Sequence, residues 1–321
     1  MFMQRLVMIL RLGAAMVTPF KARLWIIHTM TILILSASML IAGTALAKER
    51  KTVVASFTIV ADMARQVAGD ELDVISIVPA GAEIHEYAPT PRDILKARQA
   101  DLLLYNGMGL ERWFQRFYEG MDDVPAAVLT EGVEPIGLGE GPYQGRPNPH
   151  AWMTPVNGLI YVENIRQALV SLDPDHADTY NRNARAYSER LEHMDRELRA
   201  ALAHIPDKQR VLATCEGAFS YLAREYSFRE RYLWAVNAEQ EGTPQQVRRL
   251  IDDLNADRVP VTFCESTVND RAMKQVTSET GARYGGTLYV DSLTRAEGPV
   301  PDYETLLRYN AEQIKKGFDL E

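Results

Sequence analysis

Side chains that bind divalent metals stand at the ends of predicted strands in both halves of this 321-residue chain. The candidates are His85, Glu86 and His150 in the first half, and Cys215, Glu216, Cys264, Glu265 and Asp291 in the second. Imidazole nitrogens from one half and carboxylate oxygens from the other form a mixed nitrogen and oxygen site, which suits a divalent transition metal. The sequence therefore predicts a metal site assembled from both halves.

The residue types and their spacing leave two questions about this site unanswered. A histidine in a loop is commonly only a solvated or hydrogen-bonded side chain, and the candidate ligands are 65 to 75 residues apart with no short metal motif between them. Glu216 and Glu265 each follow a cysteine at a strand end, so the sequence does not choose between them. Other chemistries lack their motifs, because the chain has no Gly-x-Ser-x-Gly elbow, no Walker loop and no His-Glu-x-x-His.

Short apolar, β-branched runs alternate with segments of helical periodicity along the chain after residue 48. The predicted strands are 52–57, 73–78, 101–106 and 126–129, and then 210–214, 232–236, 260–264 and 288–290. Alternating strands and helices indicate parallel sheets, whose ligands lie beyond the carboxyl ends of the strands. We therefore expect an α/β fold with two parallel-sheet lobes, residues 48–172 and 206–321, and the metal site in the cleft between them.

One long helix over residues 173–205 is predicted to join the two lobes as a rigid bridge. Asp173 is the expected N-cap, Pro174 suits the first helical position, and Pro206 ends the helix. An apolar stripe at helical spacing marks the buried face: Tyr180, Ala184, Tyr187, Leu191, Met194, Leu198, Leu202 and Ile205. The alternative is a single helical domain that contains this helix. His193, between the stripe residues, is interpreted as a surface side chain.

Residues 1–47 have the pattern of a secretory signal peptide. Lys21 and Arg23 precede an uncharged apolar run, and Ala45-Leu46-Ala47 is a small-x-small cleavage pattern. A retained membrane anchor and a start at Met16 are the alternatives. The whole chain has a net charge of −8, which argues against a nucleic-acid partner. We expect a protein of the bacterial periplasm, an oxidising compartment.

Four sequence blocks resemble one known family. They are 80–87 (AGAEIHEY), 147–153 (PNPHAWM), 216–222 (EGAFSYL) and 289–293 (YVDSL). In this order they are similar to the metal-binding substrate-binding proteins of bacterial ABC importers, above all to the iron and manganese binders of enteric-type bacteria. The resemblance extends from about residue 51 to residue 317. It implies two α/β lobes joined by one long helix, and it assigns the metal ligands to His85, His150, Glu216 and Asp291, with Glu265 as a neighbour.

The resemblance also implies a cargo and a partner. Two imidazoles with two carboxylates suit Mn(II) or Fe(II), and Zn(II) is expected to bind as well. The third histidine ligand and the histidine-rich acidic loop of the zinc-specific branch are missing from the sequence. We therefore expect a monomeric, non-enzymatic protein that delivers the metal to an ABC permease. A metalloenzyme and a surface adhesin on the same fold are the alternatives.

The two cysteines, Cys215 and Cys264, close the first and third predicted strands of the second lobe. In the common doubly wound order these strands are neighbours, close enough for a disulfide in an oxidising compartment. A pair of buried free thiols and a thiolate ligand for zinc remain the alternatives. Because protons compete for the histidine ligands, metal affinity is expected to fall below pH ~6.5, the value for an unperturbed imidazole.

Overall fold

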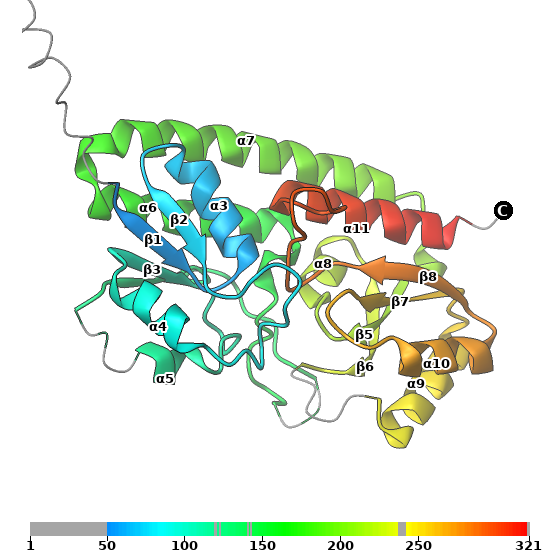
Figure 1. Ribbon diagram of the computed structural model, residues 1–321. Helices are drawn as coiled ribbons and strands as arrows, with labels where there is room; N and C mark the ends of the chain where they lie inside the picture. Colours follow the sequence, from blue (N-terminus) through cyan, green and yellow to red (C-terminus); the bar gives the residue numbers. More distant parts are fainter. Residues whose placement is uncertain are drawn as a thin grey trace, which may run out of the picture. The chain divides into compact units, whose positions relative to one another are not determined.

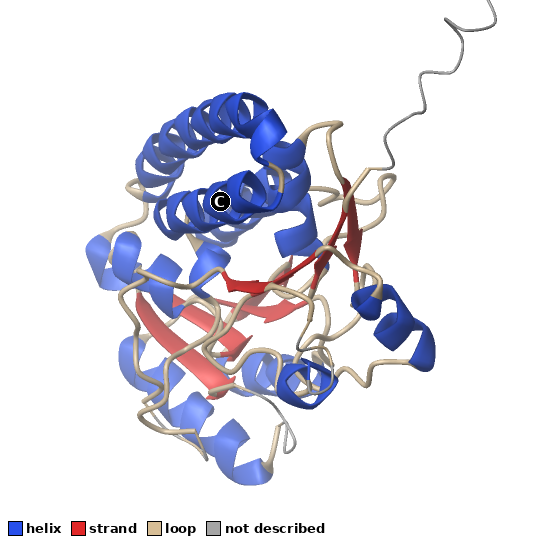
Figure 2. Cartoon of the chain, turned by 90° about the vertical axis from the view of Figure 1, so that its left-hand side faces the viewer, coloured by secondary structure: helices blue, strands red, loops and turns tan. Residues whose placement is uncertain are grey.

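The computed structural model describes residues 50–118, 121, 123–139, 141, 143–236 and 242–319. The predicted signal peptide, residues 1–47, lies outside this part of the chain. None of the described helices is both long enough and apolar enough to cross a membrane. In Figures 1 and 2 the strands lie between helices, which is the layered arrangement of an α/β fold.

The first lobe contains one four-stranded parallel sheet in the order β2-β1-β3-β4. Its strands are β1 (Thr52–Ala55), β2 (Asp73–Ser76), β3 (Leu102–Tyr105) and β4 (Ala126–Val128). Its helices are α3 (Thr58–Ala68), α4 (Pro91–Arg98), α5 (Phe114–Tyr118) and α6 (Pro155–Leu172). Thr90 caps α4 through a capping box with Asp93.

The second lobe is parallel as predicted, but it holds two two-stranded sheets where one sheet was expected. Strand β5 (Val211–Glu216) pairs with β6 (Arg229–Trp234), and β7 (Val261–Glu265) pairs with β8 (Arg283–Leu288). The helices are α8 (Ser220–Glu225), α9 (Pro244–Asp257), α10 (Arg271–Thr280) and α11 (Tyr303–Phe318). A disulfide joins β5 to β7 between Cys215 and Cys264, whose Cα atoms are 4.9 Å apart.

Strand β8 corrects the predicted strand 288–290, because it begins at Arg283 and ends at Leu288. The sequence analysis missed its first half because Gly285 and Gly286 weaken a strand pattern. Gly285 is required by packing, since a Cβ at this position would lie 2.4 Å from the ring of Phe263 on β7.

The long helix α7 (Ala177–Leu202) is shorter than predicted. Residues Pro174–His176 form a 3₁₀ turn, and the Asp173 carboxylate accepts hydrogen bonds from His176 and Tyr180 instead of capping α7. The 26 residues of α7 span roughly 39 Å. The predicted apolar stripe is buried throughout. This face packs on α3 and α6 of the first lobe and on α11 of the second, so α7 contacts both lobes (Figure 1).

Candidate metal centre

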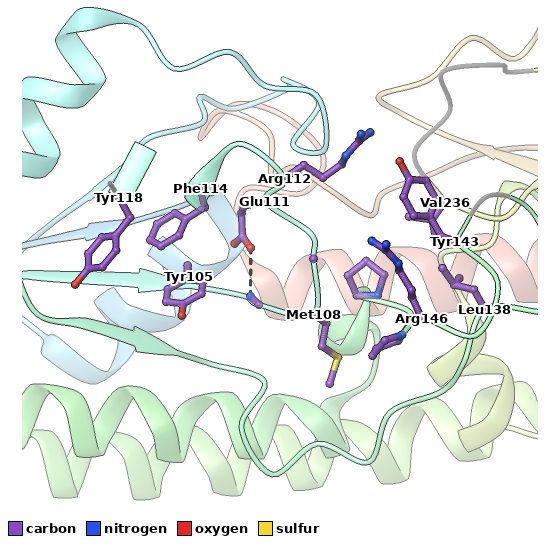
Figure 3. Close-up of a pocket in the computed structure, with 14 residues that line it drawn as sticks. Tyr105, Met108, Glu111, Arg112, Phe114, Tyr118, Leu138, Tyr143, Arg146 and Val236 are labelled. Atoms are coloured by element: carbon purple, nitrogen blue, oxygen red, sulfur yellow. Dashed lines mark hydrogen bonds between the residues drawn. The ribbon is translucent and has the colours of Figure 1, made fainter. Parts of the chain in front are cut away.

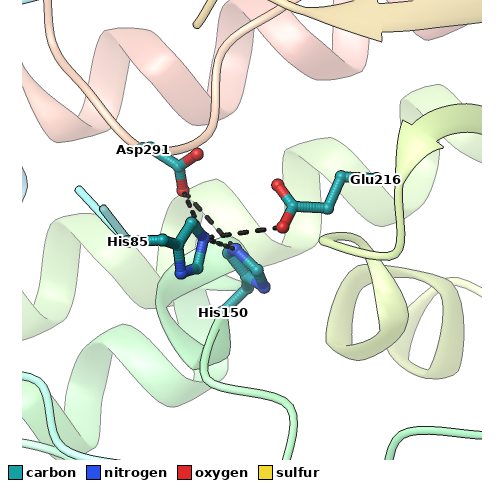
Figure 4. Close-up of side chains that lie close together, drawn as sticks. All are labelled: His85, His150, Glu216 and Asp291. Atoms are coloured by element: carbon teal, nitrogen blue, oxygen red, sulfur yellow. Dashed lines mark hydrogen bonds and ion pairs between the residues drawn. The ribbon is translucent and has the colours of Figure 1, made fainter. Parts of the chain in front are cut away.

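Four predicted ligand residues from four separate segments converge between the lobes (Figure 4). His85 lies in the loop after β2, and His150 directly precedes the 3₁₀ turn Ala151–Met153. Glu216 is the last residue of β5, and Asp291 follows β8. The structure thus brings together the four residues that the family resemblance implied as ligands.

The ligand atoms are spaced as the donors to one metal ion would be. The Nε2 atoms of His85 and His150 are 3.2 Å apart. His85 Nε2 is 3.5 Å from Glu216 Oε1 and 4.0 Å from Asp291 Oδ1, and His150 Nε2 is 3.5 Å from Asp291 Oδ1. Donors at about 2.1 Å from a tetrahedral ion would be about 3.4 Å apart. One divalent ion therefore fits between these four atoms.

The centre, expected in the cleft between the lobes, is buried in this structure. The exposed fractions are 3% for His85, 0% for His150, 2% for Glu216 and 1% for Asp291. No hydrogen bond from the described residues reaches Asp291 Oδ1, although its other oxygen accepts one from Thr267. A buried carboxylate oxygen that faces two imidazoles without a hydrogen-bond donor is suited to bind a cation.

The orientation of His150 is fixed by Asn148, which the sequence analysis did not single out. Asn148 Oδ1 accepts hydrogen bonds from the His150 backbone N–H at 3.1 Å and from the ring Nδ1 at 2.9 Å. Because a backbone N–H can only donate, the Asn148 atom that faces it must be the oxygen, and His150 Nδ1 must carry its proton. The free lone pair is therefore on Nε2, which points at the other ligands.

Burial sets the protonation state of His85. It lowers the pKa of His85 to about 4, against the opposing effect of the Asp291 charge. His85 is therefore neutral and able to bind metal at neutral and mildly acidic pH. The predicted fall in metal affinity used the pKa of an unperturbed imidazole, near ~6.5, as its reference. For His85, burial moves proton competition to lower pH.

Burial alone would raise the pKa of Asp291, but its contacts with His150 and Thr267 lower it below its usual range. Asp291 is therefore ionised beside the neutral His85. The centre combines this anionic oxygen donor with imidazole nitrogen.

Glu265 lies beside the ligand set. Its Oε2 accepts a hydrogen bond from the Glu216 backbone N–H at 3.3 Å, and burial raises the pKa of Glu265 to about 8. Cys215 and Cys264 form a disulfide, which excludes the alternatives of free thiols and of a thiolate ligand. The candidate carboxylates are Glu216 at the end of β5 and Glu265 at the end of β7. Of these two, Glu216 converges with both histidines.

Two cavities lie next to the centre. One of about 630 Å³ is lined by Met108, Glu111, Arg112, Tyr143 and Arg146 among others, and by none of the four candidate ligands (Figure 3). A second cavity of about 540 Å³ shares Arg112 with the first and reaches His85. None of the candidate ligands thus lines the larger of these two cavities, and His85 alone lines the smaller one.

Comparison with known sequences identifies the family of this chain. The model of the family described as "Zinc-uptake complex component A periplasmic" matches residues 53–317. The chain belongs to this family. It is 55% identical over 292 residues to the iron-binding protein YfeA of Yersinia pestis, covering 89% of this chain and 94% of that protein. It is 36% identical over 279 residues to the manganese ABC transporter substrate-binding lipoprotein PsaA of Streptococcus pneumoniae, covering 84% and 90%.

Members of this family have also been solved as structures. The Mn-bound periplasmic metal-binding protein of Candidatus Liberibacter asiaticus matches with a TM-score of 0.78 and 38% identity. The match covers 84% of this chain and 100% of that structure. The α/β fold is therefore shared with a periplasmic metal-binding protein, and relatives such as PsaA are named as substrate-binding lipoproteins of ABC transporters.

Proposed function

We propose that this protein captures a divalent transition metal, Mn(II) or Fe(II), between its two lobes and delivers it to the permease of an ABC importer. Zn(II) is a third candidate cargo. The ligands in this proposal are His85, His150, Glu216 and Asp291. The observation that carries it is the convergence of two Nε2 atoms and two carboxylate oxygens at separations of 3.2 to 4.0 Å.

The ligand chemistry supports a transition metal as cargo. Oxygen donors favour Mn(II) and Fe(II), and imidazole suits Fe(II) and Zn(II), so the mixed set accepts all three. Affinity for Zn(II) is expected to exceed that for Mn(II) by the general order of divalent metals. The names of two relatives support iron and manganese as the cargo, since they specify these metals.

The proposal includes an address and an organisation for the chain. Residues 1–47 act as a signal peptide, and the mature protein works as a monomer in the periplasm. Residues 48–172 and 206–321 act as the two lobes, with 173–205 as the linking segment. The names of the family and its relatives support an extracytoplasmic location, because they specify periplasmic proteins and lipoproteins.

A binding role without catalysis fits the centre better than a metalloenzyme does. A catalytic metal keeps a coordination position open for water or substrate. Here four protein donors surround the proposed ion, and each donor residue is at most 3% exposed. If the protein were only an adhesin, deleting its gene would leave metal uptake unaffected. Growth of the deletion strain on limiting manganese therefore separates adhesion from transport.

Calorimetry on the metal-stripped protein tests the proposal directly. We expect one Mn(II) or Fe(II) to bind per chain with a dissociation constant in the micromolar range or below. Matched titrations with Mg(II) should give no comparable binding, because Mg(II) disfavours imidazole ligands. A protein that binds neither Mn(II) nor Fe(II) at micromolar concentration would contradict the proposed function.

A further inference from the structure

The single amide of Asn148 bonds to the candidate ligand His150 and to the segment that directly follows Glu216. It is 1% exposed, and its own backbone is held on both sides. The Asn148 N–H donates to the Ile136 carbonyl at 2.7 Å, and the Asn148 carbonyl accepts from the Tyr221 hydroxyl at 2.8 Å. The side chain therefore starts from a fixed backbone position.

The oxygen of this amide faces the first lobe's ligand. It accepts from the backbone and the ring of His150, as described above, and so determines which ring nitrogen carries the proton. A hydrogen bond to the non-coordinating nitrogen of a histidine ligand fixes the ring and raises its basicity toward the metal.

The nitrogen of the same amide faces the second lobe. Asn148 Nδ2 donates to the Gly217 carbonyl at 2.6 Å and to Ser220 Oγ at 3.0 Å. Gly217 directly follows the ligand Glu216. Ser220 in turn donates to the partly buried carboxylate of Glu230 at 2.5 Å, so the far end of the contact is anchored on β6.

All the hydrogen-bonding capacity that this amide offers to the protein is thus used, with two bonds on each side. Only an amide of this length presents two acceptor positions to one segment and two donors to the other. Aspartate is the same size, but it would place a carboxylate oxygen against the Gly217 carbonyl. Alanine would leave the His150 N–H groups and the Gly217 carbonyl unpaired in a buried site, which is unfavourable.

On the basis of the proposed function, we propose that Asn148 is a positioning residue that holds His150 and the Glu216 turn in register, and that it thereby sets the rate of metal release. Loss of an outer hydrogen bond to a metal ligand typically lowers metal affinity by about 10- to 100-fold. Asn148 makes such a bond to His150 and also holds the Gly217 carbonyl next to Glu216, so we expect the effect of its loss to fall within this range and to act mainly on dissociation.

The test compares Asn148→Ala with Asn164→Ala. Asn164 on α6 is a matched control, because its amide donates to the carbonyls of Leu129 and Glu131 at 2.8 and 2.9 Å and touches no candidate ligand. Stopped-flow release of Mn(II) into a chelator gives the dissociation rate. The visible absorption of the protein saturated with Co(II) reports the coordination geometry, which a general loss of stability leaves unchanged.

We expect at least tenfold faster Mn(II) release and an altered Co(II) spectrum for Asn148→Ala, and neither change for Asn164→Ala. The isosteric Asn148→Asp should also release Mn(II) at least tenfold faster, and it keeps the test valid if the alanine variant does not fold. A wild-type release rate in either folded Asn148 variant, or a wild-type Co(II) spectrum in Asn148→Ala, would overturn the inference. Failure of the unmodified chain to bind Mn(II) and Co(II) would instead contradict the proposed function.

Discussion

The disulfide between Cys215 and Cys264 gives a prediction whose magnitude follows from the structure. The bridge closes a loop with a sequence separation of 49 residues, and both cysteines are buried. The loss of loop entropy in the unfolded chain for a ring of this size corresponds to about 4 kcal/mol, and measured contributions are commonly 2–4 kcal/mol. Replacing both cysteines by alanine should therefore lower the free energy of unfolding by about 2–4 kcal/mol.

Thermal unfolding of the metal-free protein is the assay. A loss of this size should lower the melting temperature by roughly 5–15 °C. Wild-type protein kept reduced throughout the experiment should melt near the temperature of the double alanine variant, because both lack the bridge. A thiol titration of the denatured, unreduced wild type should find no reactive thiol. Two reactive thiols, or a double variant as stable as the oxidised wild type, would refute the reasoning.

Three further predictions concern individual side chains. His85→Ala or Asp291→Ala should weaken Mn(II) binding at least tenfold in calorimetry, while His193→Ala, on the exposed face of α7, should change nothing; equal losses at His85 and His193 would contradict the ligand assignment. In NMR titration of the metal-free protein, His85 should stay neutral down to about pH 4, because burial disfavours the imidazolium, and a midpoint above pH 6 would contradict the buried environment. Burial also raises the pKa of Asp62 to about 6, so the folded protein loses stability as pH rises through this value. Asp62→Asn should therefore raise the unfolding free energy at pH 7.5 by about 1–2 kcal/mol and change it much less at pH 4, and an equal gain at both pH values would show that ionisation is not the cause.

Much of the fold was predictable because local sequence signals and the final packing agree. The stripe from Tyr180 to Leu202 identified the buried face of α7. The family resemblance selected Glu216 over Glu265, a choice that the strand pattern alone could not make. The convergence of the four candidate ligands follows from parallel strands whose carboxyl ends face one another.

The remaining features depend on contacts between distant segments, which no local pattern reports. The second lobe divides into two sheets, and the disulfide between Cys215 and Cys264 joins a strand of one sheet to a strand of the other. The low pKa of His85 results from burial by segments that lie far away in the sequence. The role of Asn148 could have been suspected from its place two residues before His150, but its contact with Gly217 arises only from the approach of the two lobes.

The most direct test of the proposed metal centre is anomalous diffraction at the manganese edge from crystals of the metal-stripped protein grown with Mn(II). The account predicts one strong peak bounded by His85 Nε2, His150 Nε2, Glu216 and Asp291, at about 2.1–2.3 Å from each donor atom. No peak between these four side chains, or a single peak elsewhere on the molecule, would contradict it.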